Sequence, residues 1–325
     1  MIFANYLRFV VDSKSHLLYR LTCRVLYYVD RFNAKTRKSA VIPFLNRYYA
    51  KLQVVLFDLG AAGGIDPIYQ LLVGLPNFKA IGFDPDKQDM ESLEITSKIR
   101  FYPHAIAGNS GKRTLHITKS RGCSSLYPPN EKNLKEYSVS DLFQVVRTEE
   151  LDVITLDEFI EQNNVPYPDF LKMDVQGAEY EIFKESARTL DNVIGISFET
   201  RLREIYKGEG LSPASHSLLA RLGFRLISKV GRSPHFDGET LEVEMAYVRG
   251  IDSLTTEEKL VKAVLFCVCH ENLTFAAHLV SASSLASEQK SRFLKMLRKD
   301  FGFPGTPETC MLKFAVERDA HKRRA

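Results

Sequence analysis

Residues Val54 to Gly64 read Val-Val-Leu-Phe-Asp-Leu-Gly-Ala-Ala-Gly-Gly, a short apolar run that ends near an acid and is followed by three glycines. This pattern predicts a buried parallel strand that turns sharply into a helix. Glycines let the backbone adopt positive φ and approach a ligand closely, and the next helix presents free N–H groups to that ligand. Glycine-rich turns also occur for packing alone, so the stretch by itself leaves both interpretations open.

The acid in this stretch narrows the class of ligand. Asp58 would bring negative charge to the crevice beside the glycines, which is unfavourable for a pyrophosphate and favourable for an ammonium or sulfonium group. The loop therefore favours an amino-acid-bearing nucleoside such as S-adenosylmethionine over a dinucleotide. A full G-x-G-x-x-G motif is also missing, which disfavours a nicotinamide-dependent oxidoreductase.

Three more acids follow predicted strands farther along the chain. Parallel strands of an open α/β sheet place their carboxyl ends at one edge, where ligands bind, so we expect these acids to meet there. Alternation of strands and helices without internal repeats predicts a doubly wound sheet. The strands and acids are 78–83 with Asp84, 169–174 with Asp174, and 193–198 with Glu199.

Asp84 and the segment after it are candidates for contact with a nucleoside. An acid roughly 20 residues beyond a glycine loop commonly accepts hydrogen bonds from both ribose hydroxyls. His104 and Ala105 would lie where an adenine could be covered, although His104 could equally be an ordinary half-buried histidine. Asp86 could instead act as the cap of the next helix.

Composition limits the class of protein. The chain has 325 residues, 45% of them hydrophobic, and a formal net charge of only +4, which does not indicate a nucleic-acid binder. Five cysteines, an odd number, argue against a disulfide framework and for a reducing compartment. The sequence has no apolar run long enough to span a membrane and no secretory signal, so we expect a cytoplasmic protein.

The first 50 residues form a basic segment. Nine Lys or Arg side chains against two Asp give them an excess of +7, and residues 16–32 have the spacing of an amphipathic helix. One interpretation is peripheral contact with an anionic membrane surface or an acidic substrate. The other, a more common role, is a helix that covers the main domain. We therefore divide the chain into a helical segment 1–50, an α/β domain 51–250 and a helical extension 251–325.

The C-terminal extension contains one cluster of potential metal ligands. Three helices are predicted there, over 257–269, 274–281 and 288–297. Cys267-Val-Cys269-His270 lacks a second ligand pair at zinc spacing, so we interpret it as a buried helix face and predict no metal site.

An ordered set of motifs over residues 53–249 resembles the FkbM family of S-adenosylmethionine-dependent methyltransferases. The resemblance implies a Rossmann-like seven-stranded domain that methylates hydroxyl groups of sugars, glycans or natural products. Ala62 replaces an Asn common in the family, and Asp84 replaces a common Glu. The motifs are Asp58 to Gly64, Gly82 to Asp86, Cys123 to Leu126 with Pro129 and Asn130, Lys172 to Glu179, and the Glu199 region with Tyr206.

The resemblance also implies roles for individual residues. Asp174 and Glu199 would face the acceptor, and methyl transfer to a hydroxyl benefits from a base, for which we favour Asp174. Glu199 or Glu179 would orient Asp174, and His235 is a less favoured candidate for the base. Glu179 could equally be an acid that the dipole of the following helix favours in its first turn. The cofactor would contact Asp58, Gly60, Ala61 and Gly64 through its methionine part, Asp84 through its ribose, and His104 and Ala105 through its adenine.

An alternative of another class is a non-catalytic scaffold. Such a protein would keep the methyltransferase-like fold and use its basic N-terminal segment on a membrane or an acidic partner. Binding of S-adenosylhomocysteine distinguishes the two, because a scaffold that has lost its chemistry does not need the cofactor crevice. The oligomeric state cannot be derived from these motifs.

Overall fold

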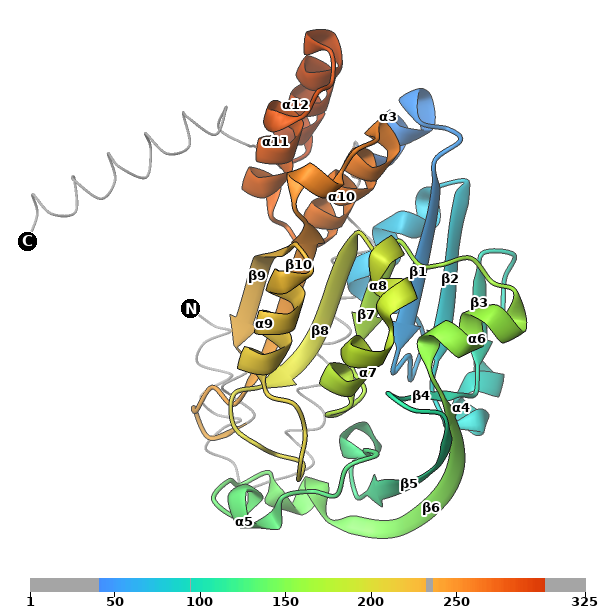
Figure 1. Ribbon diagram of the computed structural model, residues 1–325, viewed down its shortest axis with the longest axis vertical. Helices are drawn as coiled ribbons and strands as arrows, with labels where there is room; N and C mark the ends of the chain where they lie inside the picture. The colour runs from blue at the N-terminus through green and yellow to red at the C-terminus, as the bar shows by residue number, and fades with distance from the viewer. Residues whose placement is uncertain (1–40, 94, 232–235, 302–325) are drawn as a thin grey trace, which may run out of the picture.

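The computed structural model describes residues 41–93, 95–231 and 236–301 of the chain (Figure 1). In this part of the chain a seven-stranded sheet forms the centre of the molecule, with strands in the order β3-β2-β1-β7-β8-β10-β9. The strands are β1 (Gln53–Leu59), β2 (Asn77–Phe83), β3 (Ile99–Tyr102), β7 (Phe170–Met173), β8 (Gly195–Arg201), β9 (Phe224–Gly231) and β10 (Glu242–Arg249).

The order of the strands reverses at β1. From β1 the chain continues to β2 and β3 on one side, and it later returns to β7 and β8 on the other side. β1 is parallel to both neighbours, whereas β10 is antiparallel to β8 and β9. A reversal of this kind leaves a crevice outside the carboxyl ends of the two central strands. The predicted doubly wound, Rossmann-like sheet is confirmed.

The apolar run of β1 is continuous because the strand is buried on both faces. Val54 and Leu56 belong to one apolar cluster, and Val55 and Phe57 belong to another on the opposite face. The first face is covered by α3 (Val41–Tyr48), η1 (Pro67–Gly74), α10 (Glu257–Cys269), α11 (Leu273–Ala282) and α12 (Ser287–Phe301). The second is covered by α6 (Leu156–Asn163), α7 (Glu179–Glu185), α8 (Ala187–Asn192) and α9 (Ser212–Arg221).

The helical segment after β7 is divided at Ser186 into α7 and α8, although the sequence after Asp174 predicts one continuous helix from about 179 to 190. Ser186 has non-helical dihedral angles, with φ −112° and ψ 44°. The carboxylate of Asp157 on α6 accepts hydrogen bonds from the backbone N–H groups of Arg188 and Thr189, at 3.1 and 2.9 Å. These N–H groups belong to the first turn of α8, so a side chain from another helix stabilises the new start.

The C-terminal helix α10 begins and ends at the predicted residues, and its apolar side chains share a cluster with β1. Cys267 and Cys269 are buried, and Nε2 of His270 lies 3.1 Å from the hydroxyl of Tyr69. This confirms the interpretation of these residues as a buried helix face.

Among the described residues, no group of three or more His, Cys, Asp or Glu side chains is arranged to hold a metal ion. No helix in the same ranges combines the length and apolarity required to cross a bilayer.

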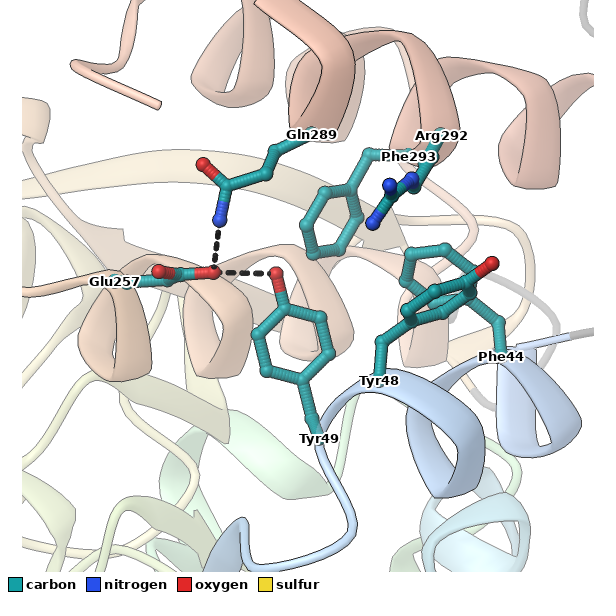
Figure 2. Close-up of a pocket in the computed structure, with 7 residues that line it drawn as sticks. All are labelled: Phe44, Tyr48, Tyr49, Glu257, Gln289, Arg292 and Phe293. Atoms are coloured by element: carbon teal, nitrogen blue, oxygen red, sulfur yellow. Dashed lines mark hydrogen bonds between the residues drawn. The ribbon is translucent and has the colours of Figure 1, made fainter. Parts of the chain in front are cut away.

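The described N-terminal and C-terminal helices meet at one end of the sheet. Phe44 of α3 packs against Phe293 of α12, with ring centroids 4.9 Å apart. Figure 2 shows a small cavity here, where Glu257 accepts hydrogen bonds from the Tyr49 hydroxyl at 2.6 Å and from Gln289 at 2.9 Å. The cavity is near the start of β1, so it lies away from the carboxyl ends of the strands (Figure 1).

A smaller sheet and several short helices lie at the carboxyl end of the large sheet (Figure 1). In this sheet β6 pairs with β4 in parallel and with β5 in antiparallel orientation. These segments place the loop 120–130 above the central strands. Their bounds are β4 (Ala105–Ile106), β5 (Gly111–Thr118), β6 (Val145–Ile154), α4 (Lys87–Ser92), η2 (Arg121–Cys123), α5 (Glu131–Leu134) and η3 (Ser140–Phe143). The short helix η5 (Ile251–Ser253) follows β10 at the opposite end of the large sheet.

Candidate active site

The loop after β1 brings three glycines with positive φ to the carboxyl edge of the sheet. A Cβ atom on Gly60 would lie 2.0 Å from the carbonyl oxygen of Asp174, so this glycine is required by packing. A Cβ atom on Gly63 would meet no described atom within 4 Å, and one on Gly64 would meet only Leu93 at 4.0 Å. Gly63 and Gly64 are therefore required for the positive φ of the backbone, and their missing side chains leave open space along the loop.

Asp58 is fully buried beneath this loop. One of its oxygens lies 3.1 Å from Nζ of Lys172, which faces it in register on β7, and the other accepts from the backbone N–H of Asp66 at 2.8 Å. Burial raises the pKa of Asp58 to about 6, against the opposing charge of Lys172. Burial disfavours the charged Lys172, but Asp58 and Asp174 outweigh it and raise its pKa. The negative charge expected from Asp58 is thus compensated inside the protein.

The nucleoside candidates lie on the β2 and β3 side of the same loop. Asp84 follows β2 directly and is half-buried, and its Oδ1 accepts from the backbone N–H of Asp86 at 2.9 Å. The imidazole of His104 lies against Phe159, and its Nδ1 is buried without a hydrogen-bond partner. Burial and the nearby Lys87 lower the pKa of His104, which favours a neutral ring. Ala105 is buried in β4.

Asp174 and Glu199 meet through an amide that the sequence analysis did not assign. The side-chain N–H₂ group of Gln176 donates to Oδ1 of Asp174 at 2.6 Å and to Oε1 of Glu199 at 3.3 Å. Asp174 is half-buried, and Glu199 is 8% exposed. The two predicted acceptor-facing acids are therefore held side by side at the carboxyl ends of β7 and β8.

Glu199 was expected to follow its strand, but β8 continues to Arg201. The reason is the antiparallel partner β10, whose residues Glu244 and Glu242 pair with Glu199 and Arg201. β7 is shorter, and its last pair with β8 joins Met173 to Phe198. Glu199 therefore lies within β8 but one residue beyond the last pair with β7. This position still places Glu199 at the crevice.

Arg201 is the central cation of this region. Its side chain is 1% exposed and lies 2.8 Å from Glu199, 3.3 Å from Glu242 and 3.9 Å from Glu209. Burial disfavours the charged guanidinium, but these carboxylates outweigh that cost and hold its pKa well above the usual range. Arg201 stands two residues after Glu199 on the same face of β8, a spacing that could have indicated the pair from sequence.

Glu179 directs its carboxylate toward the loop that precedes α7. Oε1 accepts from the backbone N–H of Val175 and Oε2 from that of Gly177, both at 3.0 Å. The side chain is 1% exposed, and burial raises the pKa of Glu179 to about 7, while Arg201 opposes this shift. Glu179 therefore holds the shape of the loop that carries Asp174 and Gln176.

The loop 120–130 lies over this arrangement. Ser125 Oγ donates to the backbone carbonyl of Gln176 at 2.5 Å, and the carbonyl of Cys123 accepts from the Tyr206 hydroxyl at 2.9 Å. Arg121 forms an ion pair with Asp86. Burial raises the pKa of the Cys123 thiol to about 11, which favours its protonated form. The loop thus covers the edge at which the acids meet.

The donor set fits an amino-acid-bearing nucleoside. Gly63 and Gly64 leave room beside the backbone, Asp84 offers a carboxylate, and the unpartnered Nδ1 of the neutral His104 is available to a polar ring atom. These residues surround one loop, as the strand order requires. His235, the outside candidate for the base, and the amphipathic stretch 16–32 lie outside the described residues.

Comparison with known proteins identifies one family and several solved structures. The model of the methyltransferase FkbM domain matches residues 58–226, just over half of the chain. No curated protein matches the chain. Among solved structures, magnesium protoporphyrin IX methyltransferase from Synechocystis PCC 6803, with bound SAM, is 11% identical at a TM-score of 0.33, covering 67% of this chain and 80% of its own. A protein of the NADB-Rossmann superfamily from Streptococcus agalactiae is 15% identical at a TM-score of 0.32, covering 81% of this chain and 95% of its own.

Proposed function

The chain belongs to the methyltransferase FkbM family, whose cofactor is S-adenosylmethionine, and from this premise we propose that it methylates a hydroxyl group of a sugar, glycan or natural product. The observation that carries the proposal is the pair of carboxylates on Asp174 and Glu199, held by one amide beside the glycine loop. A hydroxyl is a weak nucleophile at neutral pH, so a nearby carboxylate that accepts its proton assists the reaction.

The roles of the residues follow from their positions. When bound, S-adenosylmethionine supplies a methyl carbon made electrophilic by the attached sulfonium. Asp174 would accept the proton that the acceptor hydroxyl loses as it takes up this methyl group. Because Oδ1 of Asp174 accepts from Gln176, we assign the proton to Oδ2. Glu199 orients the acceptor through a second hydrogen bond.

The glycine loop contributes alignment. Gly63 and Gly64 let the backbone lie close to the methionine part, and Gly60 packs directly on the carbonyl of Asp174. This contact ties the donor side of the crevice to the acceptor side. Alignment of two reactants can contribute roughly 7–11 kcal/mol to a barrier reduction, so a fixed distance between the two loops matters more than additional acid–base groups.

The first test is cofactor binding. Calorimetry with S-adenosylhomocysteine should give one site per chain, and Gly64→Val should abolish it, since a side chain at φ 110° is strained and would enter the open space beside the loop. Gly122→Val is the matched control, because this glycine also lies in open space but has no positive φ. Wild-type protein without detectable binding would contradict the proposal.

The second test identifies the methylated atom. Wild-type protein is incubated with methyl-labelled S-adenosylmethionine and an extract of the native host, and the labelled product is treated with mild base. A methyl ether on a hydroxyl keeps its label, whereas a methyl ester releases labelled methanol. Release of methanol, or label recovered on nitrogen, would overturn the O-methylation of a hydroxyl while leaving the methyltransferase activity intact.

The proposal includes a cytoplasmic location. The described cysteines Cys123, Cys267 and Cys269 are free thiols, which suits a reducing compartment. We also propose, independently of catalysis, that residues 1–50 make peripheral contact with a membrane. Cosedimentation with vesicles of anionic phospholipid, compared between the full chain and a variant with Arg20, Arg24 and Arg31 changed to Gln, tests it without reference to catalysis.

A further inference from the structure

Gln176 uses all of its side-chain hydrogen-bonding capacity. Its Oε1 accepts from Nη2 of Arg201 and from the hydroxyl of Tyr206, both at 2.8 Å. The single hydrogen of that hydroxyl is shared with the backbone carbonyl of Cys123, at 2.9 Å. Its Nε2 donates to Asp174 and to Glu199. An amide has two acceptor sites on oxygen and two hydrogens on nitrogen, so every site is matched to a partner of the right kind.

This environment determines the orientation of the amide. Rotation by 180° would place the N–H₂ group against the guanidinium of Arg201, which can only donate, and would place Oε1 against the two carboxylates. Three of the four favourable contacts would become unfavourable, because only the Tyr206 hydroxyl can accept as well as donate, and buried polar groups without partners are costly. The guanidinium of Arg201, assisted by the hydroxyl of Tyr206, therefore keeps the N–H₂ group directed at Asp174 and Glu199.

The backbone of Gln176 is also held in an uncommon conformation. Its φ of 53° lies in the left-handed region, which is unfavourable for a residue with a side chain. Ser125 donates to its carbonyl, and Glu179 accepts from the N–H groups on either side of it. Strain that the surroundings maintain in this way is concentrated at functional sites.

We propose that Gln176 is a positioning residue for methyl transfer, with Arg201 and Tyr206 as the groups that orient it. Its two N–H bonds hold the carboxylates of Asp174 and Glu199 next to each other despite their like charge. One oxygen of Asp174 is occupied in this way, and the other is directed to the acceptor hydroxyl. The inference rests on the proposed function, since it assigns Gln176 a part in the reaction at the same site.

The test uses full-length protein, methyl-labelled S-adenosylmethionine and the host extract that contains the acceptor. Gln176→Met keeps the size of the side chain and removes all four contacts, so the transfer rate at saturating cofactor should fall about 100-fold, as expected for a misplaced base. Tyr206→Phe removes one of two donors to Oε1, together with the bond to the Cys123 carbonyl, and the loss of the bond to Gln176 should lower its rate about fivefold. The dissociation constant of S-adenosylhomocysteine, measured by calorimetry, should change less than twofold in both.

A double-mutant cycle on Gln176 and Tyr206 distinguishes positioning of the amide from general support of the fold. If Tyr206 acts through Gln176, Tyr206→Phe should not lower the rate further in the Gln176→Met background. Tyr137→Phe is the matched control, because the partners of the Tyr137 hydroxyl are Glu239, to which it donates, and Arg203, from which it accepts, and neither bond involves Gln176. Its transfer rate should equal that of the wild type.

The outcomes that would overturn the role of Gln176 are distinct from those that would overturn the proposed function. A Gln176→Met rate within threefold of wild type, or a loss of cofactor affinity as large as the loss of rate, would overturn the inference. Should Gln176→Met not fold, Tyr206→Phe with an unchanged rate would overturn it equally. If the wild type binds S-adenosylhomocysteine and transfers label but Gln176 proves irrelevant, only this inference fails; if the wild type does neither, the proposed function fails as well.

Discussion

Two strand ends at the centre of the sheet share a sequence pattern but differ in what surrounds the acid. Asp58 at the end of β1 and Asp174 after β7 both follow an apolar run and precede a glycine. Asp58 has no exposed surface and is paired with Lys172 and a backbone N–H group. Asp174 is half-buried, and its hydrogen-bond donor is the neutral amide of Gln176.

The difference indicates a division of roles between the acids. An acid whose charge is compensated inside the protein stabilises the crevice, whereas an acid that keeps a free oxygen at the edge can exchange a proton with a ligand. The interpretation of Asp58 as a direct ligand of the cofactor stays a prediction, and its contact with Asp66 offers an indirect route through the loop. Removing the charge of one acid at a time tests this division of roles.

The largest effect is expected at Asp174. Asp174→Asn should lower the rate of methyl transfer about 10²- to 10⁴-fold, the usual contribution of a general base. Calorimetry should give nearly unchanged affinity for S-adenosylhomocysteine, and urea unfolding should give a nearly unchanged free energy of unfolding. Retained activity would remove Asp174 from the role of the base.

At Asp58 the same change should act on stability. Asp58→Asn keeps an acceptor for the N–H of Asp66 but leaves the charge of Lys172 buried without its partner, which should lower the free energy of unfolding by roughly 3–5 kcal/mol. Adding Lys172→Met should recover part of the loss. Asp141→Asn, which removes one member of a surface pair with Lys119, is the control and should cost at most about 1 kcal/mol. Equal effects at Asp58 and Asp141 would contradict the division of roles.

A smaller effect concerns pH and the loop that carries Asp174. Burial raises the pKa of Glu179 to about 7, above the 4.5 of a free glutamate. Between these values the folded protein binds a proton that the unfolded chain has lost, so stability should fall as pH rises from 4.5 to 7, by on the order of 3 kcal/mol. In Glu179→Gln the decline in the urea-unfolding free energies should be smaller by this amount, with a remainder from Asp58, whose pKa burial also raises. An identical slope in both proteins would show that other groups cause the dependence.

The smallest effect is expected at Gly63. Gly63→Ala meets no described atom but must adopt a φ of 78°, so it should lower the free energy of unfolding by about 1 kcal/mol. Affinity for S-adenosylhomocysteine should fall more steeply, because the added methyl group enters the space beside the loop. Gly122→Ala, without a positive φ, should change neither quantity. A loss of stability at Gly63 without any loss of affinity would indicate that the loop serves packing alone.

Local patterns predicted most of the elements. The apolar run before Asp58 and the segment 257–269 specify a strand and a helix because burial on two faces or on one stripe leaves a periodicity in the sequence. The break at Ser186 was not predictable, since the side chain that stabilises the start of α8, Asp157, is distant in sequence. The continuation of β8 to Arg201 likewise depends on its pairing with β10.

The sequence by itself determined the class of fold, the family and the edge of the sheet at which the acids gather. These properties depend on the order of apolar runs, glycines and strand-end acids, which are features of neighbouring residues. Only the tertiary structure decided which acid is compensated and which is available, because Lys172 reaches Asp58 through strand register and Arg201 and Tyr206 reach Gln176 from another part of the chain. Charge compensation and hydrogen-bond direction are non-local quantities, and no pattern of adjacent residues specifies them.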